Sequence, residues 1–170
     1  MRVYVCYNTK NIVKKWGRIK KTPMTLDEIK DLEIVKKFFA NDNFARLVGI
    51  EIDSVSEERA VVSVKVDERH ENANSCVQGG MLYTLADFAF AVISNYKHPV
   101  TVTQGGHIQY LRPATGTKLT ATAWETERVG HNSVCEVRIV DDTEQTVAVA
   151  HFNGFVKEIN KEELWGKLSK

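Results

Sequence analysis

The spacing of hydrophobic residues changes along the chain, and each spacing predicts a different element of secondary structure. Between residues 25 and 40 apolar side chains recur at helical spacing, which indicates a helix. Thr25 and Glu28 have the spacing of a capping box, in which the threonine hydroxyl caps the first turn and the glutamate reaches back to it. Asn41-Asp42-Asn43 interrupts the pattern, so we expect the helix to end near residue 40 and a short turn to lead to Gly49.

From residue 50 onward apolar residues alternate with polar ones, which is typical of strands that bury one face. Residues 50–66 are predicted to form a hairpin that turns at Glu57-Glu58-Arg59. After a long apolar segment, further strands are predicted at residues 100–111, 118–128, 133–141 and 146–156. Their connections are short, and short connections join neighbouring antiparallel strands because parallel pairs need a crossover. We therefore expect a largely antiparallel sheet.

The segment 79–95, between the hairpin and the later strands, is almost entirely apolar, and Asp87 is its only charged residue. A membrane span is rejected because about 17 residues is at the short limit for a bilayer, an acid lies in the middle, and basic residues do not flank both ends. The segment is predicted to be a helix that protein surrounds on nearly all sides. The sequence therefore predicts an α+β fold in which an antiparallel sheet curls around a long central helix.

Length and composition indicate one globular domain, since the chain has 170 residues, of which 43% are hydrophobic and 26% charged. Lys and Arg number 23 against 22 for Asp and Glu, so no overall charge favours a nucleic-acid or membrane partner. The first 21 residues carry only basic charges. We expect residues 1–24 to be a basic extension outside the core, with Met24 as an alternative start. The domain is expected at residues 25–157, followed by a polar tail at 158–170.

The reactive side chains do not follow a disulfide or metal pattern. Cys6, Cys76 and Cys135 are widely spaced without a CxxC pair, which favours a reducing, cytoplasmic location. The short apolar run near the N-terminus does not have the form of a secretory signal. The five histidines lack HxH or HExxH spacing, so no metal site is expected. No histidine has an evident sequence relation to Cys76, so an inert thiol is favoured there over a nucleophile.

Asp87 is the main candidate for chemistry, because a carboxylate in an apolar segment is either satisfied by specific partners or kept reactive. Helical spacing places Gly79, Gly80, Tyr83 and Thr84 on the same face as Asp87. Two glycines at the start of a helix leave unpaired N–H groups at its positive end. Such donors can stabilise an oxyanion, although two glycines can also simply end a loop.

The distance between these groups predicts a dimer. Gly79 and Asp87 are eight residues apart in the sequence, which corresponds to about 12 Å along one helix. One copy cannot bring both groups to the same carbonyl. If they act together, Asp87 must come from a second subunit whose helix runs antiparallel across a two-fold axis, which gives two composite sites in a homodimer.

The motif with Asn72, Gln78-Gly79-Gly80 and Asp87 resembles the signature of hotdog-fold acyl-CoA thioesterases of the phenylacetic acid degradation (PaaI) type. The run Ile108-Gln109-Tyr110-Leu111-Arg112-Pro113-Ala114 is similar to the strand of this family that ends in an Arg-Pro turn, and Phe38-Phe39-Ala40 through Gly49-Ile50 is similar to its usual opening. The resemblance covers about residues 35–157. It implies the hotdog fold and an acyl-CoA thioesterase that is a homodimer with intersubunit sites, assembled further to a tetramer.

The resemblance also implies roles for individual residues. The Gly79 N–H would polarise the thioester carbonyl, and Asp87 of the partner subunit would act as general base or nucleophile. Asn72 would help to position these groups, and Thr103 would orient the attacking water or Asp87. Coenzyme A enters only as part of the substrate, with no other cofactor and no metal.

Further residues are candidates for substrate binding. These are Gly80, Tyr83 and Thr84 on the helix face, and Arg112, Arg128 and His131, which could meet the phosphates of coenzyme A although exposed cations are usually solvated. The family usually has histidine where this chain has Gln78, and an amide can donate a hydrogen bond but cannot titrate. If the family histidine only orients the carbonyl, Gln78 can substitute for it; if that position must carry a proton, the chain should be slow or inactive.

Two other functions remain open at this point. A non-catalytic acyl-CoA-binding or sensing module would use the same fold, but a DNA-reading version would need a helix-turn-helix, for which the residues before the sheet are too few. A hotdog-fold dehydratase would need a catalytic histidine motif that the chain does not have. The sequence does not distinguish an aromatic from an aliphatic acyl group, since the apolar residues near Asp87 suit both.

Overall fold

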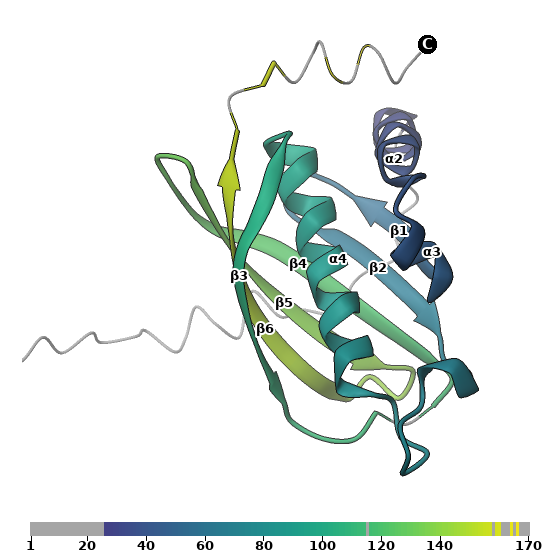
Figure 1. The fold of residues 1–170 in the computed structure, drawn as a ribbon. Coiled ribbons are helices and arrows are strands. Elements are labelled where there is room, and N and C mark those ends of the chain that lie inside the picture. Colours follow the sequence, from purple (N-terminus) through teal and green to yellow (C-terminus); the bar gives the residue numbers. More distant parts are fainter. Residues whose placement is uncertain (1–25, 115, 158, 161–163, 165, 167–170) are drawn as a thin grey trace, which may run out of the picture.

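In the part of the chain that the computed structural model describes, six strands form one antiparallel sheet that wraps around a long helix (Figure 1). The described residues are 26–114, 116–157, 159, 160, 164 and 166. The helices are α2 (Leu26–Phe39), α3 (Asn43–Leu47) and α4 (Gly79–Lys97), with a short 3-10 helix at Glu68–His70. The strands are β1 (Ile50–Val55), β2 (Ala60–Lys65), β3 (Thr101–Tyr110), β4 (Lys118–Val129), β5 (Asn132–Asp141) and β6 (Thr146–Val156). Their order in the sheet is β1-β2-β4-β5-β6-β3.

Helix α4 lies across one face of the sheet and forms the centre of the hydrophobic core (Figure 1). Along β5 buried residues alternate with more exposed ones, as a strand with one covered face requires. The largest fully buried side chains come from both layers: Leu85, Phe90 and Ile93 from α4, and Leu119, Ile139 and Phe152 from the sheet. The rings of Phe90 and Phe152 stack with their centroids 5.3 Å apart, so aromatic packing joins the helix to β6.

The predicted fold class and most of the predicted elements are confirmed. The first helix ends at Phe39, and the hairpin turn is closed by a bond from the Ser56 N–H to the Arg59 carbonyl of 2.9 Å. The four later strands begin and end within one residue of their expected bounds. The central helix runs to Lys97 rather than ending at residue 95.

The turn expected before Gly49 contains a short helix, α3, which the pattern did not predict. Asp42 caps this helix, because its Oδ1 accepts hydrogen bonds from the N–H groups of Phe44 (3.2 Å) and Ala45 (2.9 Å). The residues that break the α2 pattern therefore start a new helix. Gly49 follows it with φ 74°, a left-handed conformation that glycine adopts without strain.

The expectation that short connections join neighbouring strands is wrong for β3 and β4. Strand β3 pairs with β6 at the edge of the sheet, whereas β4 lies between β2 and β5. The link between residues 110 and 118 therefore crosses the ends of two strands, a span of roughly 15 Å that a few extended residues can cover. As a result β3 is an edge strand, with one edge unpaired among the described residues.

A buried carboxylate fixes the C-terminal end of α4 to the sheet. The side chain of Glu125 on β4 is 8% exposed and pairs with Lys97 Nζ at 2.7 Å and His98 Nε2 at 2.9 Å. Ser133 Oγ donates a third contact of 2.7 Å. Burial alone would raise the pKa of Glu125, but the hydrogen bonds from Lys97 and Ser133 and the nearby His98 hold this pKa below its ordinary value. The charge of Glu125 is thus compensated by its contacts, which serve a structural role.

Glycines on β3 allow the edge strand to lie close to α4. A Cβ atom on Gly106 would lie 2.3 Å from Cε1 of Phe152 and 2.6 Å from the hydroxyl of Tyr83. The ring of Tyr83 meets Phe152 edge-on with centroids 5.4 Å apart. Gly106 therefore provides the space in which the helix tyrosine packs against the sheet.

We predict that Gly106→Ala destabilises the protein by about 1–3 kcal/mol, because the added methyl group overlaps Phe152 and Tyr83. Gly105→Ala is the matched control, since its Cβ would meet one side-chain oxygen of Asn153 at an ordinary 3.5 Å. Urea unfolding at equal protein concentrations measures both. Equal destabilisation by the two variants would contradict the packing described here.

The remaining sequence predictions for the termini lie outside the described residues. These are the basic extension 1–24, the alternative start at Met24, the cap at Thr25 and most of the tail 158–170, so the domain bounds stay predictions. Within the described residues, none of the helices combines the length and the hydrophobicity needed to cross a membrane.

Candidate active site

One face of α4 lies beside the edge strand β3 and is covered only in part, and it carries the residues that helical spacing placed together with Asp87. Gly79, Gly80, Tyr83, Thr84 and Asp87 are partly or fully exposed, while most other residues of the helix are buried. The Thr84 hydroxyl donates to the Gly80 carbonyl at 2.8 Å. The structure therefore brings the predicted carboxylate and the predicted helix start onto one accessible surface.

Asp87 is held by β3 through a hydroxyl group. Thr103 Oγ1 donates to Asp87 Oδ1 at 3.1 Å, and no lysine, arginine or histidine in the described part of the chain forms an ion pair with this carboxylate. Burial raises the pKa of Asp87 above its ordinary value, the Thr103 hydrogen bond lowers it, and the negative charge of Asp42 raises it. The carboxylate is thus oriented without being neutralised, as a general base requires.

The start of α4 offers two free backbone donors. The Met81 N–H is already used, because it donates to the backbone carbonyl of Gln78 at 2.9 Å and to Gln78 Oε1 at 3.1 Å. The N–H groups of Gly79 and Gly80 have no acceptor among the described residues. Both lie at the positive end of a helix of 19 residues. They can bind a carbonyl oxygen that develops negative charge.

Gln78 is the N-cap of α4. Its side-chain oxygen would lie 2.7 Å from a Cβ atom on Gly80, so the second glycine makes room for the side chain to fold back over the helix start. With its oxygen committed to Met81, the Gln78 amide keeps only its NH2 group for a ligand.

Asn72 makes local contacts in the loop before α4. Its Oδ1 accepts from the N–H groups of Asn74 (2.8 Å) and Cys76 (3.3 Å), which leaves its NH2 group without a partner among the described residues. Among the described residues of one subunit, no hydrogen bond joins Asn72 to Asp87 or to Gly79.

Tyr110 contributes to the site but was not among the predicted site residues. Its hydroxyl donates to the Gly79 carbonyl at 2.9 Å, and a Cβ atom on Gly79 would lie 3.2 Å from its Cζ. Tyr83 lies between this tyrosine and the carboxylate: burial raises its pKa, as do the nearby Asp87 and Tyr110. The sequence offered one signal, since Tyr110 belongs to the run 108–114 that resembles the family, but nothing in that run indicates contact with Gly79.

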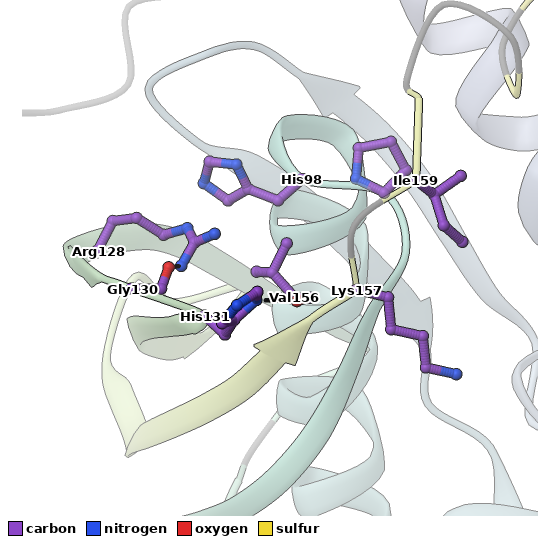
Figure 2. Close-up of a pocket in the computed structure, with 8 residues that line it drawn as sticks. His98, Arg128, Gly130, His131, Val156, Lys157 and Ile159 are labelled. Carbon is purple, nitrogen blue, oxygen red and sulfur yellow. Dashed lines mark hydrogen bonds between the residues drawn. The ribbon is translucent and has the colours of Figure 1, made fainter.

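The basic residues predicted to bind phosphate do not form one site within a subunit. Arg128 and His131 line a surface depression of about 470 Å³ with His98 and Lys157 (Figure 2). His131 stacks on Phe155. Arg112 instead lies at the other end of β6, where its side chain donates to Gln145 Oε1 at 2.9 Å and its backbone N–H to the Val147 carbonyl. The length of β6 separates the two places by roughly 30 Å.

Arg128 is partly satisfied by the chain itself, because its guanidinium donates to the Gly130 carbonyl (Figure 2).

Among the described residues, no three His, Cys, Asp or Glu side chains gather in a way that could hold a metal ion. Cys135 is buried, which raises the pKa of its thiol to about 12, so this cysteine is a poor nucleophile.

A sheet wrapped around a long central helix is the hotdog fold, and in this chain a carboxylate and free N–H donors share one face of that helix. The family model described as Domain of unknown function (DUF4442) matches residues 33–156. The acyl-coenzyme A thioesterase PaaI of Escherichia coli (strain K12) is 36% identical over 112 residues, which are 65% of this chain and 80% of that protein.

Solved structures give the same result. The structure of the E. coli PaaI protein from the phenylacetic acid degradation operon superimposes with a TM-score of 0.71 at 30% identity and covers 76% of this chain and 95% of that chain. A hypothetical thioesterase protein of Streptococcus pneumoniae TIGR4, solved with coenzyme A, has a TM-score of 0.66 at 25% identity over 72% of this chain and 96% of that chain. The chain belongs to the PaaI-type family of hotdog-fold acyl-CoA thioesterases, and it also matches the DUF4442 family model.

We predict that Asp87→Asn stabilises the folded protein at neutral pH, because the variant removes the cost of burying a charge. The pKa of Asp87 is raised on folding, so the cost is present above the folded pKa and is absent below the unfolded pKa of about 3.9. The difference in melting temperature between the variant and the wild type measures the gain in stability, with about 2–4 °C for each kcal/mol. The gain should shrink as the pH falls; a gain that is equal at pH 3.5 and pH 7.5 would contradict the burial of this carboxylate.

Proposed function

We propose that this protein hydrolyses acyl-CoA thioesters to a free acid and coenzyme A. The observation that carries the proposal is the half-buried carboxylate of Asp87, oriented by Thr103 and lacking an ion-pair partner among the described residues, on the same helix face as the free N–H groups of Gly79 and Gly80. Membership of the PaaI-type family supports the same reaction.

In the proposed reaction a water molecule attacks the thioester carbonyl. Asp87 of the partner subunit accepts the proton of this water, and the Gly79 N–H stabilises the negative charge that develops on the carbonyl oxygen. The carbon–sulfur bond then breaks and coenzyme A leaves as a thiolate. Because a thiol has a pKa of about 8.5, the leaving group needs no strong general acid. The NH2 groups of Gln78 and Asn72 are additional donors near the helix start.

The reaction requires a homodimer. Gly79 and Asp87 are separated by about two turns of one helix, roughly 12 Å, so one subunit cannot place both on one carbonyl. The unpaired edge of β3 and the open face of α4 are next to each other, which suits a two-fold dimer with antiparallel α4 helices. Two such dimers would form the tetramer expected from the family resemblance.

The nucleotide part of coenzyme A would bind at basic groups on the surface. The depression with Arg128 and His131 is our candidate for the site that binds the phosphates. Arg112 lies at the other end of β6, so it would contact the ligand at a separate place. Gly80, Tyr83 and Thr84 would lie beside the thioester, whose acyl group is aromatic or aliphatic. A coenzyme A substrate and the absence of a cysteine framework in the sequence fit a cytoplasmic location.

The alternative is a protein of the same fold that binds acyl-CoA without hydrolysing it. Gln78 favours this alternative, because the family usually has a titratable histidine there. Against it, Gln78 caps α4, a role that needs no proton transfer, and the base in the proposed reaction is Asp87. Thiol release separates the two functions.

Release of coenzyme A from phenylacetyl-CoA and octanoyl-CoA tests the proposal. We expect wild-type turnover that falls at acidic pH through the raised pKa of Asp87, and an Asp87→Asn variant that is folded but slower by about 10²- to 10⁴-fold. Tight binding of both thioesters without thiol release would favour the binding module. Parental turnover by the folded variant would exclude Asp87 as the base.

Gly79→Pro tests the oxyanion donor. Proline removes the N–H group but suits the first position of a helix, and Gln78 already has the extended conformation that a following proline requires (φ −69°, ψ 135°). We expect turnover to fall by about 10²- to 10³-fold. Gly79→Ala is the matched control, because it adds a Cβ atom near Tyr110 but keeps the N–H group. Similar turnover in both variants would mean that the N–H group is not used.

A further inference from the structure

We propose that Tyr110 is a positioning residue that strengthens a second oxyanion donor, the N–H group of Gly80. The inference rests on the proposed thioesterase function and assigns to this chain a two-donor backbone site. In the proposed reaction the Gly79 N–H and the Gly80 N–H bind the same carbonyl oxygen, and the hydroxyl of Tyr110 acts on the second donor through the peptide group that carries it.

The geometry connects the tyrosine to that peptide group directly. The Tyr110 hydroxyl donates to the carbonyl of Gly79 at 2.9 Å. This carbonyl and the N–H of Gly80 belong to one planar, conjugated peptide unit. A hydrogen bond to the carbonyl oxygen draws electron density from the nitrogen, so the N–H becomes a stronger donor, in the way that chained hydrogen bonds reinforce one another. Gly80 N–H has no acceptor among the described residues and is available to a ligand.

Close packing keeps the tyrosine in this position. Its ring lies over Gly79. A Cβ atom on this glycine would lie 3.2 Å from Cζ of the ring, so a larger residue at position 79 would displace the ring. About half of Tyr110 remains exposed, at 51%, so the residue is at the border of the site rather than in the core. Its strand, β3, also carries Thr103, which holds Asp87.

Neighbouring polar side chains do not take over this role. Gln78 uses its oxygen to accept from Met81, one residue beyond the two free donors. The hydroxyl of Tyr83 lies near Gly106 on β3, where it would be 2.6 Å from a Cβ atom. Tyr110 is therefore the side chain whose hydroxyl polarises the peptide between the two glycines.

Tyr110→Phe tests the inference because it removes the hydroxyl and keeps the ring. We expect kcat for phenylacetyl-CoA to fall by about 3- to 10-fold while KM changes less than about 2-fold, since one donor is weakened but not removed. Tyr96→Phe is the matched control: its hydroxyl bonds to Asp31 at 2.7 Å near the other end of α4, so turnover should be unchanged. A parental kcat in Tyr110→Phe, or a loss that appears in KM alone, would overturn the inference.

A spectroscopic measurement separates this inference from the proposed function. Phenylacetyl-CoA labelled with ¹³C at the carbonyl is bound to Asp87→Asn and to Asp87→Asn/Tyr110→Phe, and the infrared stretch of the labelled carbonyl is compared. A higher frequency in the double variant means weaker polarisation and supports the role of Tyr110, even if the wild-type protein releases no thiol. An equal frequency in the two proteins, or failure of the thioester to bind, overturns it. A shifted frequency without thiol release in the wild-type protein would contradict the proposed hydrolysis and would still support the role of Tyr110.

Discussion

The packing of the edge strand β3 against α4 is the constraint on which the rest of the structure depends. Thr103 bonds to Asp87, Gly106 makes room for Tyr83, and the Tyr110 hydroxyl bonds to the Gly79 carbonyl. These three contacts follow one strand from end to end and reach the helix at its start and at its middle. A shift of β3 would therefore disturb the carboxylate and the backbone donors together.

The same arrangement explains why a carboxylate can be kept in an otherwise apolar helix. Asp87 is on the face that the sheet covers only in part, so its burial is partial, and Thr103 supplies one hydrogen bond without a compensating positive charge. By contrast, Glu125 at the other end of α4 contacts Lys97, His98 and Ser133. The first carboxylate is the proposed base, whereas the second holds the helix in place.

The helical and alternating patterns were enough to predict the sheet, the central helix and the face that carries Asp87, because burial sets these periods directly. The edge position of β3 could not be predicted, since the short link to β4 suggested neighbouring strands and only side-chain packing decides the order. The contact of Tyr110 with Gly79 joins residues 31 positions apart, which periodicity does not report. The cap at Gln78 depends on the rotamer of its side chain, which the sequence does not specify. Arg112, Arg128 and His131 were predicted to act together because the sequence places each at a strand end but does not say how far apart those strand ends lie.

Mixing two inactive variants tests most directly the claim that each site combines the helix start of one subunit with the carboxylate of the other. Asp87→Asn keeps the Gly79 N–H, and Gly79→Pro keeps Asp87, so a mixed dimer contains one intact site. Random exchange of equal amounts gives half mixed dimers, each with one of two sites, and should restore about a quarter of the wild-type turnover. Turnover that stays at the level of the separate variants, although subunit exchange is shown to be complete, would contradict a site shared between subunits.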